Sequence, residues 1–153
     1  MESGSKTILL VEDDKITSLI QSRNLRRVGY NVITEISGEG AVDKVENHHS
    51  QIDLVLMDID LDSELNGIQA AEIILSKFKV PVLFLSSNMD SSVINKAKSV
   101  SFYGYIFKEA RHAVLVEAIE MAIDLNKILI ILGADYKISD QYNNSSPAAL
   151  VIR

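Results

Sequence analysis

The sequence predicts a single α/β domain built on a doubly wound, five-stranded parallel sheet with helices on both faces. Three observations favour this fold class. Short apolar runs alternate regularly with stretches of helical periodicity. Most of these runs are continuously apolar, as strands buried on both faces are. The length of 153 residues is ordinary for one domain with one sizeable core.

Five apolar runs are the expected strands, at residues 7–11, 31–34, 52–57, 82–85 and 104–107. Between them, residues such as 71–78 place apolar side chains at i, i+3, i+4 and i+7, which is typical of helices. Asn66 and Gln69 resemble a capping box, and Gly29 suits the position just after a helix. The strand order expected for this arrangement is the flavodoxin-like order 2-1-3-4-5.

Residues 1–127 are expected to form this domain, and residues 128–153 an extension of the last helix followed by a tail. Residues 128–132 (ILIIL) are apolar on all sides, and a polar, turn-rich stretch follows them. The composition of the tail fits both a disordered segment and the stump of a longer polypeptide. Because so apolar an extension is poorly suited to water, we expect it to pack on a second copy as a homodimer or to fold back on its own domain.

Composition excludes several classes of protein. The chain has 15 basic and 21 acidic side chains and a formal charge of −6, so no direct nucleic-acid binding is expected. It has no cysteine, which rules out disulfides and thiolate metal sites. No signal-peptide pattern and no run of about 18 apolar residues is present, so we expect a cytoplasmic protein without a membrane segment.

Polar side chains suited to chemistry follow four of the five expected strands, while the second is followed by Glu35 without a comparable cluster. They are Glu12, Asp13 and Asp14 after the first, Asp58 after the third, Ser86 and Ser87 after the fourth, and Lys108 after the fifth. In a parallel sheet these ends lie at one edge, where ligands bind. Carboxylates so close together repel unless a cation neutralises them, and oxygen ligands suit Mg²⁺. A lysine and a hydroxyl stabilise phosphoryl oxygens, and an aspartate can attack phosphorus, so the pattern predicts phosphoryl transfer to a carboxylate.

Each of these residues also has an ordinary structural explanation. A helix N-cap is sufficient for Asp14 and could serve for Ser87. A hydroxyl in a loop after a strand, such as Ser86, is common, and Lys108 alone resembles a surface lysine. Asp58 differs because it closes a buried apolar run and needs a partner there, which favours a functional role.

Five segments together resemble the receiver domain of response regulators in two-component signalling. They are ILLVEDD (8–14), LVLMDI (54–59), NGI (66–68), PVLFLS (81–86) and GYIFK (104–108), in the order and spacing of that family. The resemblance implies that Asp58 accepts the phosphoryl group and, with Asp13 and Asp14, holds Mg²⁺, with Asp14 bound either directly or through water. It also implies that the main-chain carbonyl of Asp60 completes the protein's metal ligands.

The resemblance also implies a switch. Lys108 would pair with the phosphoryl group, and Ser86 would hydrogen-bond it and move on activation. Tyr105 matches the aromatic residue whose rotamer follows that movement, although filling the surface of the last strand explains Tyr105 equally well.

The partners implied are a histidine kinase as the phosphoryl donor and, for output, a downstream protein target or a linked output domain. Such a domain is not an enzyme beyond catalysing its own phosphorylation and dephosphorylation. The acidic loop at residues 60–65 is one residue longer than the commonest form and resembles receivers attached to sensor histidine kinases. Glu109 stands where the family usually has a proline after the lysine in a cis bond, so we predict a trans bond here.

Two alternatives remain. Asp58-Ile59-Asp60 also matches the Asp-x-Asp motif of haloacid-dehalogenase-like phosphatases, but that motif normally opens the fold, whereas two strands precede it here. A pseudo-receiver, which keeps the fold and binds partners without phosphorylation, is the second alternative.

Overall fold

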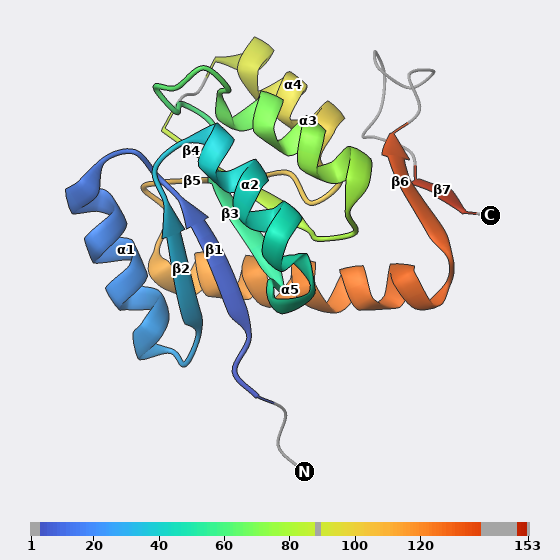
Figure 1. Ribbon diagram of the computed structural model, residues 1–153, viewed down its shortest axis with the longest axis horizontal. Helices are drawn as coiled ribbons and strands as arrows, with labels where there is room; N and C mark the ends of the chain where they lie inside the picture. The colour runs from blue at the N-terminus through green and yellow to red at the C-terminus, as the bar shows by residue number, and fades with distance from the viewer. Residues whose placement is uncertain (1–3, 88–89, 139–149, 153) are drawn as a thin grey trace.

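The computed structural model describes residues 4–87, 90–138 and 150–152, and it confirms the predicted fold class. Five parallel strands form one sheet in the order β2-β1-β3-β4-β5 (Figure 1). The strands are β1 (Thr7–Val11), β2 (Asn31–Glu35), β3 (Leu54–Asp58), β4 (Val82–Ser86) and β5 (Tyr105–Phe107). The helices are α1 (Lys15–Arg27), α2 (Gly38–His48), α3 (Gly67–Lys77), α4 (Ser91–Val100) and α5 (His112–Ile131), with a short 3₁₀ helix η1 (His49–Gln51).

Two apolar layers lie on opposite faces of the sheet. Leu9 and Val11 of β1 join the layer beneath α2, α3 and α4, whereas Ile8 and Leu10 join the layer beneath α1 and α5. The same alternation runs through β3 and β4, every residue of which is buried. Helices on both faces therefore explain why the central strands have continuous apolar sequences.

Local capping sets the ends of several helices. Asp14 caps α1, because its Oδ2 accepts a hydrogen bond from the main-chain N–H of Thr17 at 2.9 Å. At α3 the predicted capping box is present, with Asn66 and Gln69 each accepting from the main-chain N–H of the other. Gly29, just after α1, has a φ of 103°, which suits glycine.

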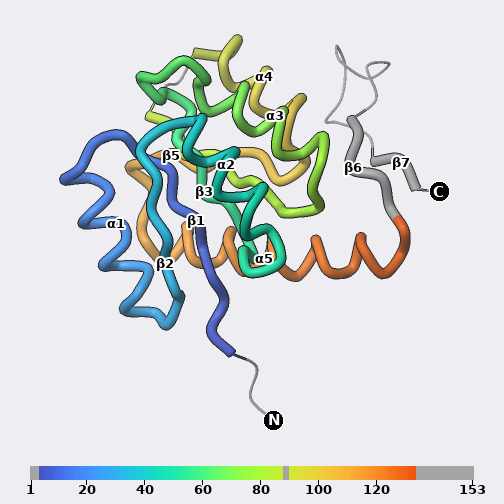
Figure 2. The backbone as a smooth tube through the Cα atoms, viewed as in Figure 1, coloured from blue at the N-terminus to red at the C-terminus, as the bar shows by residue number. Residues whose placement is uncertain are grey.

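Helix α5 continues past the end of the sheet to Ile131 (Figure 2). Leu129 is buried, whereas Ile128, Ile131 and Leu132 are 51%, 82% and 55% exposed. Beyond the helix, β6 (Ala134–Ile138) and β7 (Leu150–Ile152) pair as two antiparallel strands, a feature not predicted from the sequence. The rest of the tail, residues 139–149 and 153, lies outside the described residues. Within the part of the chain that the structure describes, no helix combines the length and apolar character needed to cross a bilayer.

Candidate functional site

The carboxyl ends of β1, β3, β4 and β5 meet at one edge of the sheet and bring the predicted side chains together. Strand β3 pairs with β1 on one side and with β4 on the other. The main-chain N–H of Ile59 donates to the carbonyl of Leu85 at 3.0 Å, and that of Lys108 donates to the carbonyl of Ser86 at 2.9 Å. The pairing therefore extends to the residues just beyond the strands, and this places Asp58 at the centre of the edge.

Lys108 bridges two buried carboxylates at this edge. Its Nζ lies 2.9 Å from Oε1 of Glu12 and 3.1 Å from Oδ2 of Asp58. The side chains of Glu12 and Asp58 are each only 2% exposed, and that of Lys108 is 25% exposed. The bond between Lys108 and Glu109 is trans, since the described residues contain no cis peptide bond. The predicted trans bond is thus confirmed, and the side chain of Lys108 is directed at Asp58.

Glu12, Asp13 and Asp58 form an acidic cluster. Each offers one carboxylate oxygen, and these three oxygens lie within 4.8 Å of one another. Three ionised carboxylates beside the single ammonium of Lys108 would leave an excess of two negative charges. A divalent cation is the simplest way to neutralise such a site.

The electrostatics of the cluster are visible in the pKa values of its members. Burial raises the pKa of Glu12 to about 6; the hydrogen bond from Lys108 opposes this rise, and the nearby Asp58 adds to it. Burial lowers the pKa of Lys108, but Glu12 and Asp58 outweigh this effect and hold the pKa above its usual value. The lysine is therefore firmly protonated, whereas the charged form of Glu12 is disfavoured without a cation.

Asp60 lies beside Asp58 in the loop that follows β3. Its main-chain N–H donates to Oδ1 of Asp58 at 3.0 Å. Burial and the charge of Asp58 raise the pKa of the Asp60 carboxyl group, and a hydrogen bond with the side chain of Ser87 lowers it. The role of the Asp60 carbonyl as a metal ligand stays a prediction.

Asp14 has a different place from the one that the sequence suggests. It is an exposed side chain at the start of α1, where the hydroxyl and main-chain N–H of Thr17 lower its pKa. Among the described residues, the carboxylates close enough to share an ion are those of Glu12, Asp13 and Asp58. Glu12 is therefore the acid that lies together with Asp13 and Asp58, and the predicted role of Asp14 in holding the metal stays a prediction. One sequence signal could have identified Glu12, because it directly follows the last residue of a buried strand.

Ser86 and Tyr105, the two predicted switch residues, lie on the neighbouring strands β4 and β5. Ser86 is fully buried at the end of β4. Tyr105 is half-buried on the outer strand β5. Its ring centroid lies 5.3 Å from the ring centroid of Phe107 and 5.8 Å from Nζ of Lys98. These positions are compatible with coupled movement, which stays a prediction.

The contacts of the loop between β3 and α3, residues 59–66, with the acidic cluster were not predicted from the sequence. The main-chain N–H of Asp62 in this loop donates to Oδ2 of Asp13 at 2.9 Å. The loop also returns very close to the strand, because a Cβ atom on Gly67 would lie 2.0 Å from the carbonyl oxygen of Asp58. Glycine is therefore required at residue 67 to keep the loop folded over the acidic cluster.

Comparisons with known proteins agree with this geometry. A family model described as "response regulator receiver domain" matches residues 8–120. The transcriptional regulatory protein PdtaR of Mycobacterium tuberculosis is 29% identical over 119 residues, which cover 77% of this chain and 57% of that protein. The response regulator ArlR of Staphylococcus aureus is 30% identical over 84 residues, covering 55% of this chain and 37% of that protein. The chain thus spans little more than half of the first relative and about a third of the second.

Two solved structures are similar over most of the chain. One is the N-terminal domain of a response regulator/sensory box/GGDEF three-domain protein from Carboxydothermus hydrogenoformans. It is 38% identical with a TM-score of 0.74, and the match covers 82% of this chain and 99% of that one. The other is the receiver domain of the sensor histidine kinase PA1611 from Pseudomonas aeruginosa, described with a magnesium ion coordinated in its active site cleft. It is 27% identical with a TM-score of 0.72, and the match covers 79% of this chain and 99% of that one.

Proposed function

We propose that this chain, which belongs to the response regulator receiver domain family, accepts a phosphoryl group on Asp58 in two-component signalling. The observation that carries this proposal is the position of Asp58. Its carboxylate is 2% exposed at the end of β3 and lies 3.1 Å from Nζ of Lys108, beside two further acids. A buried acid held between like charges and one lysine is typical of a reactive group rather than a structural one.

Mg²⁺ is the cation that fits the proposed site. The cluster offers only oxygen ligands, which Mg²⁺ prefers, and few enough of them to leave positions for water and a phosphoryl oxygen. Glu12, Asp13 and Asp58 would hold the ion, with the Asp60 carbonyl as a further ligand. When bound, Mg²⁺ supplies positive charge to the carboxylates and to the phosphoryl oxygens. The magnesium ion of the Pseudomonas aeruginosa receiver supports this choice.

The residues of the chain would perform the transfer as follows. A carboxylate oxygen of Asp58 attacks phosphorus, and a P–O bond forms as the bond from phosphorus to the donor breaks. Lys108 stays protonated and pairs with the charge on the phosphoryl oxygens, since its pKa is raised. Ser86 then donates its hydroxyl to a phosphoryl oxygen, and the rotamer of Tyr105 follows.

A histidine kinase is the proposed phosphoryl donor in the cytoplasm, and a protein target or a linked output domain receives the signal. The long acidic loop and the likeness to the receiver of a sensor histidine kinase support a receiver of the kinase-linked type. The family match and the strands before Asp58 favour this function over a haloacid-dehalogenase-like phosphatase. The acidic cluster with Lys108 favours it over a pseudo-receiver.

Incubation with acetyl phosphate and Mg²⁺ tests the proposal directly. Intact-mass measurement should show one added phosphoryl group on the wild type and none on Asp58→Asn. Asp53→Asn is a matched control, because Asp53 lies at the opposite end of β3 and its Oδ2 accepts from the main-chain N–H of Thr7. An adduct that survives in Asp58→Asn would show that the assignment is wrong, and turnover of a generic phosphomonoester would favour the phosphatase.

Self-association through the end of α5 is the remaining part of the proposal. Ile128 and Ile131 are 51% and 82% exposed there, which fits a surface covered by a second copy. Wild type should sediment as a dimer and Ile128→Gln/Ile131→Gln as a monomer. A monomeric wild type would rule this interface out.

A further inference from the structure

The loop between β3 and α3 is fastened to the first turn of α2. The carboxylate of Glu39 in α2 accepts a hydrogen bond from the main-chain N–H of Leu65. The hydroxyl of Ser63 accepts from the main-chain N–H of Gly38 at 3.2 Å and donates to the carbonyl of Leu65 at 2.6 Å. The side chains of Glu39 and Ser63 therefore join this loop to α2, a helix that contains no residue of the acidic cluster.

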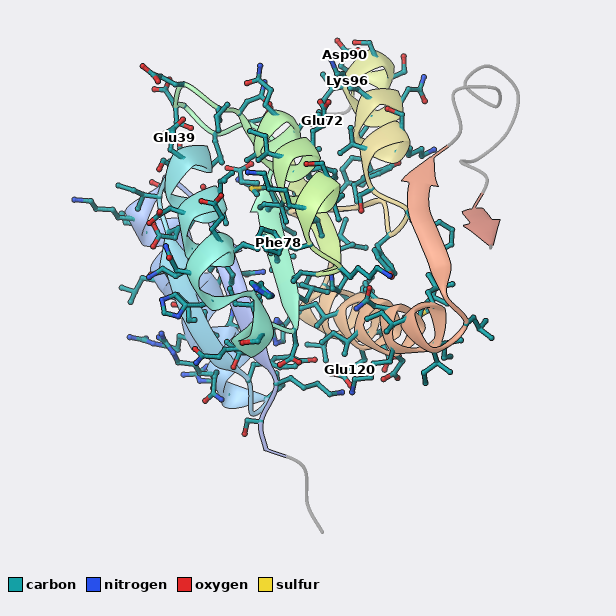
Figure 3. All side chains as sticks on the ribbon, turned by 45° about the vertical axis from the view of Figure 1, so that its right-hand side comes forward. Glu39, Glu72, Phe78, Asp90, Lys96 and Glu120 are labelled. Atoms are coloured by element: carbon teal, nitrogen blue, oxygen red, sulfur yellow. The ribbon has the colours of Figure 1, made fainter. Side chains whose placement is uncertain are left out.

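Close packing reinforces these hydrogen bonds. A Cβ atom on Gly38 would lie 2.3 Å from the carbonyl oxygen of Leu65, so only glycine allows the helix and the loop to approach so closely. Figure 3 shows Glu39 at the end of α2 that lies beside this loop. The sequence places glycine and glutamate at the two positions where the contact needs them.

The other part of the loop lies on the acidic cluster. The main-chain N–H of Asp62 donates to Oδ2 of Asp13, and that of Asp60 donates to Oδ1 of Asp58. Two of the three clustered carboxylates are thus each oriented by an amide of this loop. The loop also carries the carboxylates of Asp60, Asp62 and Glu64, and like charges beside the cluster tend to push it away. The contacts with α2 oppose this repulsion.

We propose that Glu39 and Ser63 are positioning residues for the metal site. They hold Leu65 against α2 and thereby keep the amide of Asp62 on Asp13, so they set the affinity for Mg²⁺ without touching the ion. This inference rests on the proposed Mg²⁺-dependent function. The competing explanation is that the buried side chains of Ile59 and Leu61 hold the loop by themselves.

Titration calorimetry of the full chain with Mg²⁺ tests the inference. Glu39→Ala and Ser63→Ala each remove one hydrogen bond between the loop and α2 and should weaken Mg²⁺ binding about three- to tenfold. Glu39→Gln and Ser63→Thr keep an accepting oxygen and should bind nearly as wild type does. The glutamine variant also separates the hydrogen bond from the charge of Glu39.

Glu46→Ala is the matched control. It removes one acid from the same helix, together with an ion pair of 3.3 Å to Lys77 of α3, but it leaves the loop alone. Its Mg²⁺ affinity should equal that of the wild type. If both alanine variants of the loop contact also bind Mg²⁺ as wild type does, the inference is wrong and the apolar anchors suffice. Should Glu39→Ala fail to fold, Ser63→Ala decides the outcome.

Amide hydrogen exchange in Mg²⁺-free protein supplies a second readout. The amides of Asp62 and Leu65 should exchange faster in the alanine variants than in wild type or Glu46→Ala. Unchanged exchange of Asp62 would overturn the inference even if Mg²⁺ affinity fell. A wild type that binds no Mg²⁺ would contradict the proposed function instead, and the exchange rates would then still show whether Glu39 and Ser63 hold the loop.

Discussion

Charged side chains are arranged differently at the two ends of the parallel strands. We call the side where the strands begin the amino edge and the side where they end the carboxyl edge. At the amino edge, the carboxylate of Glu120 on α5 lies 2.8 Å from Nζ of Lys6 and also accepts a hydrogen bond from the hydroxyl of Tyr30. Asp53 accepts from the main-chain N–H of Thr7 at 2.8 Å. Figure 3 shows Glu120 at the opposite end of the molecule from Glu39. Glu120 and Asp53 therefore each have donors of their own.

At the carboxyl edge, Glu12 and Asp58 share one lysine, and Asp13 lies beside them. The consequence appears in two glutamates of the same intrinsic acidity. Lys6 and then Tyr30 lower the pKa of Glu120, whereas burial raises that of Glu12 to about 6. At the amino edge the folded protein stabilises the ionised carboxylates without any ligand. At the carboxyl edge a bound cation or a phosphoryl group, which changes the charge, would stabilise the site.

Replacing a lysine at each edge should give the largest difference, which is a difference in the rate of phosphorylation. Lys108→Ala removes the cation that pairs with the phosphoryl oxygens, so phosphorylation by acetyl phosphate should slow about 100-fold or more. Lys6→Ala removes a partly exposed ion pair far from Asp58 and should leave the rate unchanged. Intact-mass time courses measure both rates. Equal rates for Lys108→Ala and wild type would contradict the role of Lys108.

Mg²⁺ binding at the carboxyl edge should raise the free energy of unfolding. Binding to the native state at 100 times the dissociation constant adds about 2.7 kcal/mol to the free energy of unfolding. Asp13→Asn removes one ligand charge and should abolish most of this gain, while the metal-free variant should be at least as stable as wild type because repulsion in the cluster falls. Thermal unfolding with and without Mg²⁺ measures both effects. A wild-type melting temperature that ignores millimolar Mg²⁺ would show that the site is wrong.

Removing a carboxylate from the amino edge should lower the free energy of unfolding, and by a smaller amount. Glu120→Gln replaces a carboxylate whose side chain is 40% exposed, so the free energy of unfolding should fall by only about 0.5 kcal/mol at neutral pH. Since the folded pKa of Glu120 is lowered, its contribution is complete above the unfolded value of about 4.3 and is lost as the pH falls through the folded pKa. Urea unfolding from pH 7 to pH 3 should show the two proteins converging. A constant difference in stability would contradict this assignment.

The sequence alone determined the fold and the centre of the site. Continuous apolar runs identified β1, β3 and β4 because strands buried on both faces need no polar alternation. The outer strands β2 and β5 are less buried and were predicted from the regular alternation of short apolar runs with helical stretches. The cap of α1 and the capping box of α3 are local contacts, so residue types three positions apart were enough to predict them. Asp58 and Lys108 were predicted because each stands at the end of an apolar run, and parallel strands bring such ends together.

Only the tertiary structure decided which acids join Asp58 and what holds the loop above them. Glu12, Asp13 and Asp14 are consecutive, and their types do not reveal that the first turns inward to Lys108 while the third caps α1. The contact between Asp13 and Asp62 joins residues 49 positions apart, and the one between Glu39 and Leu65 joins residues 26 apart. Periodicity describes how a segment packs on its own sheet, but such contacts depend on where separate loops meet after the sheet has formed.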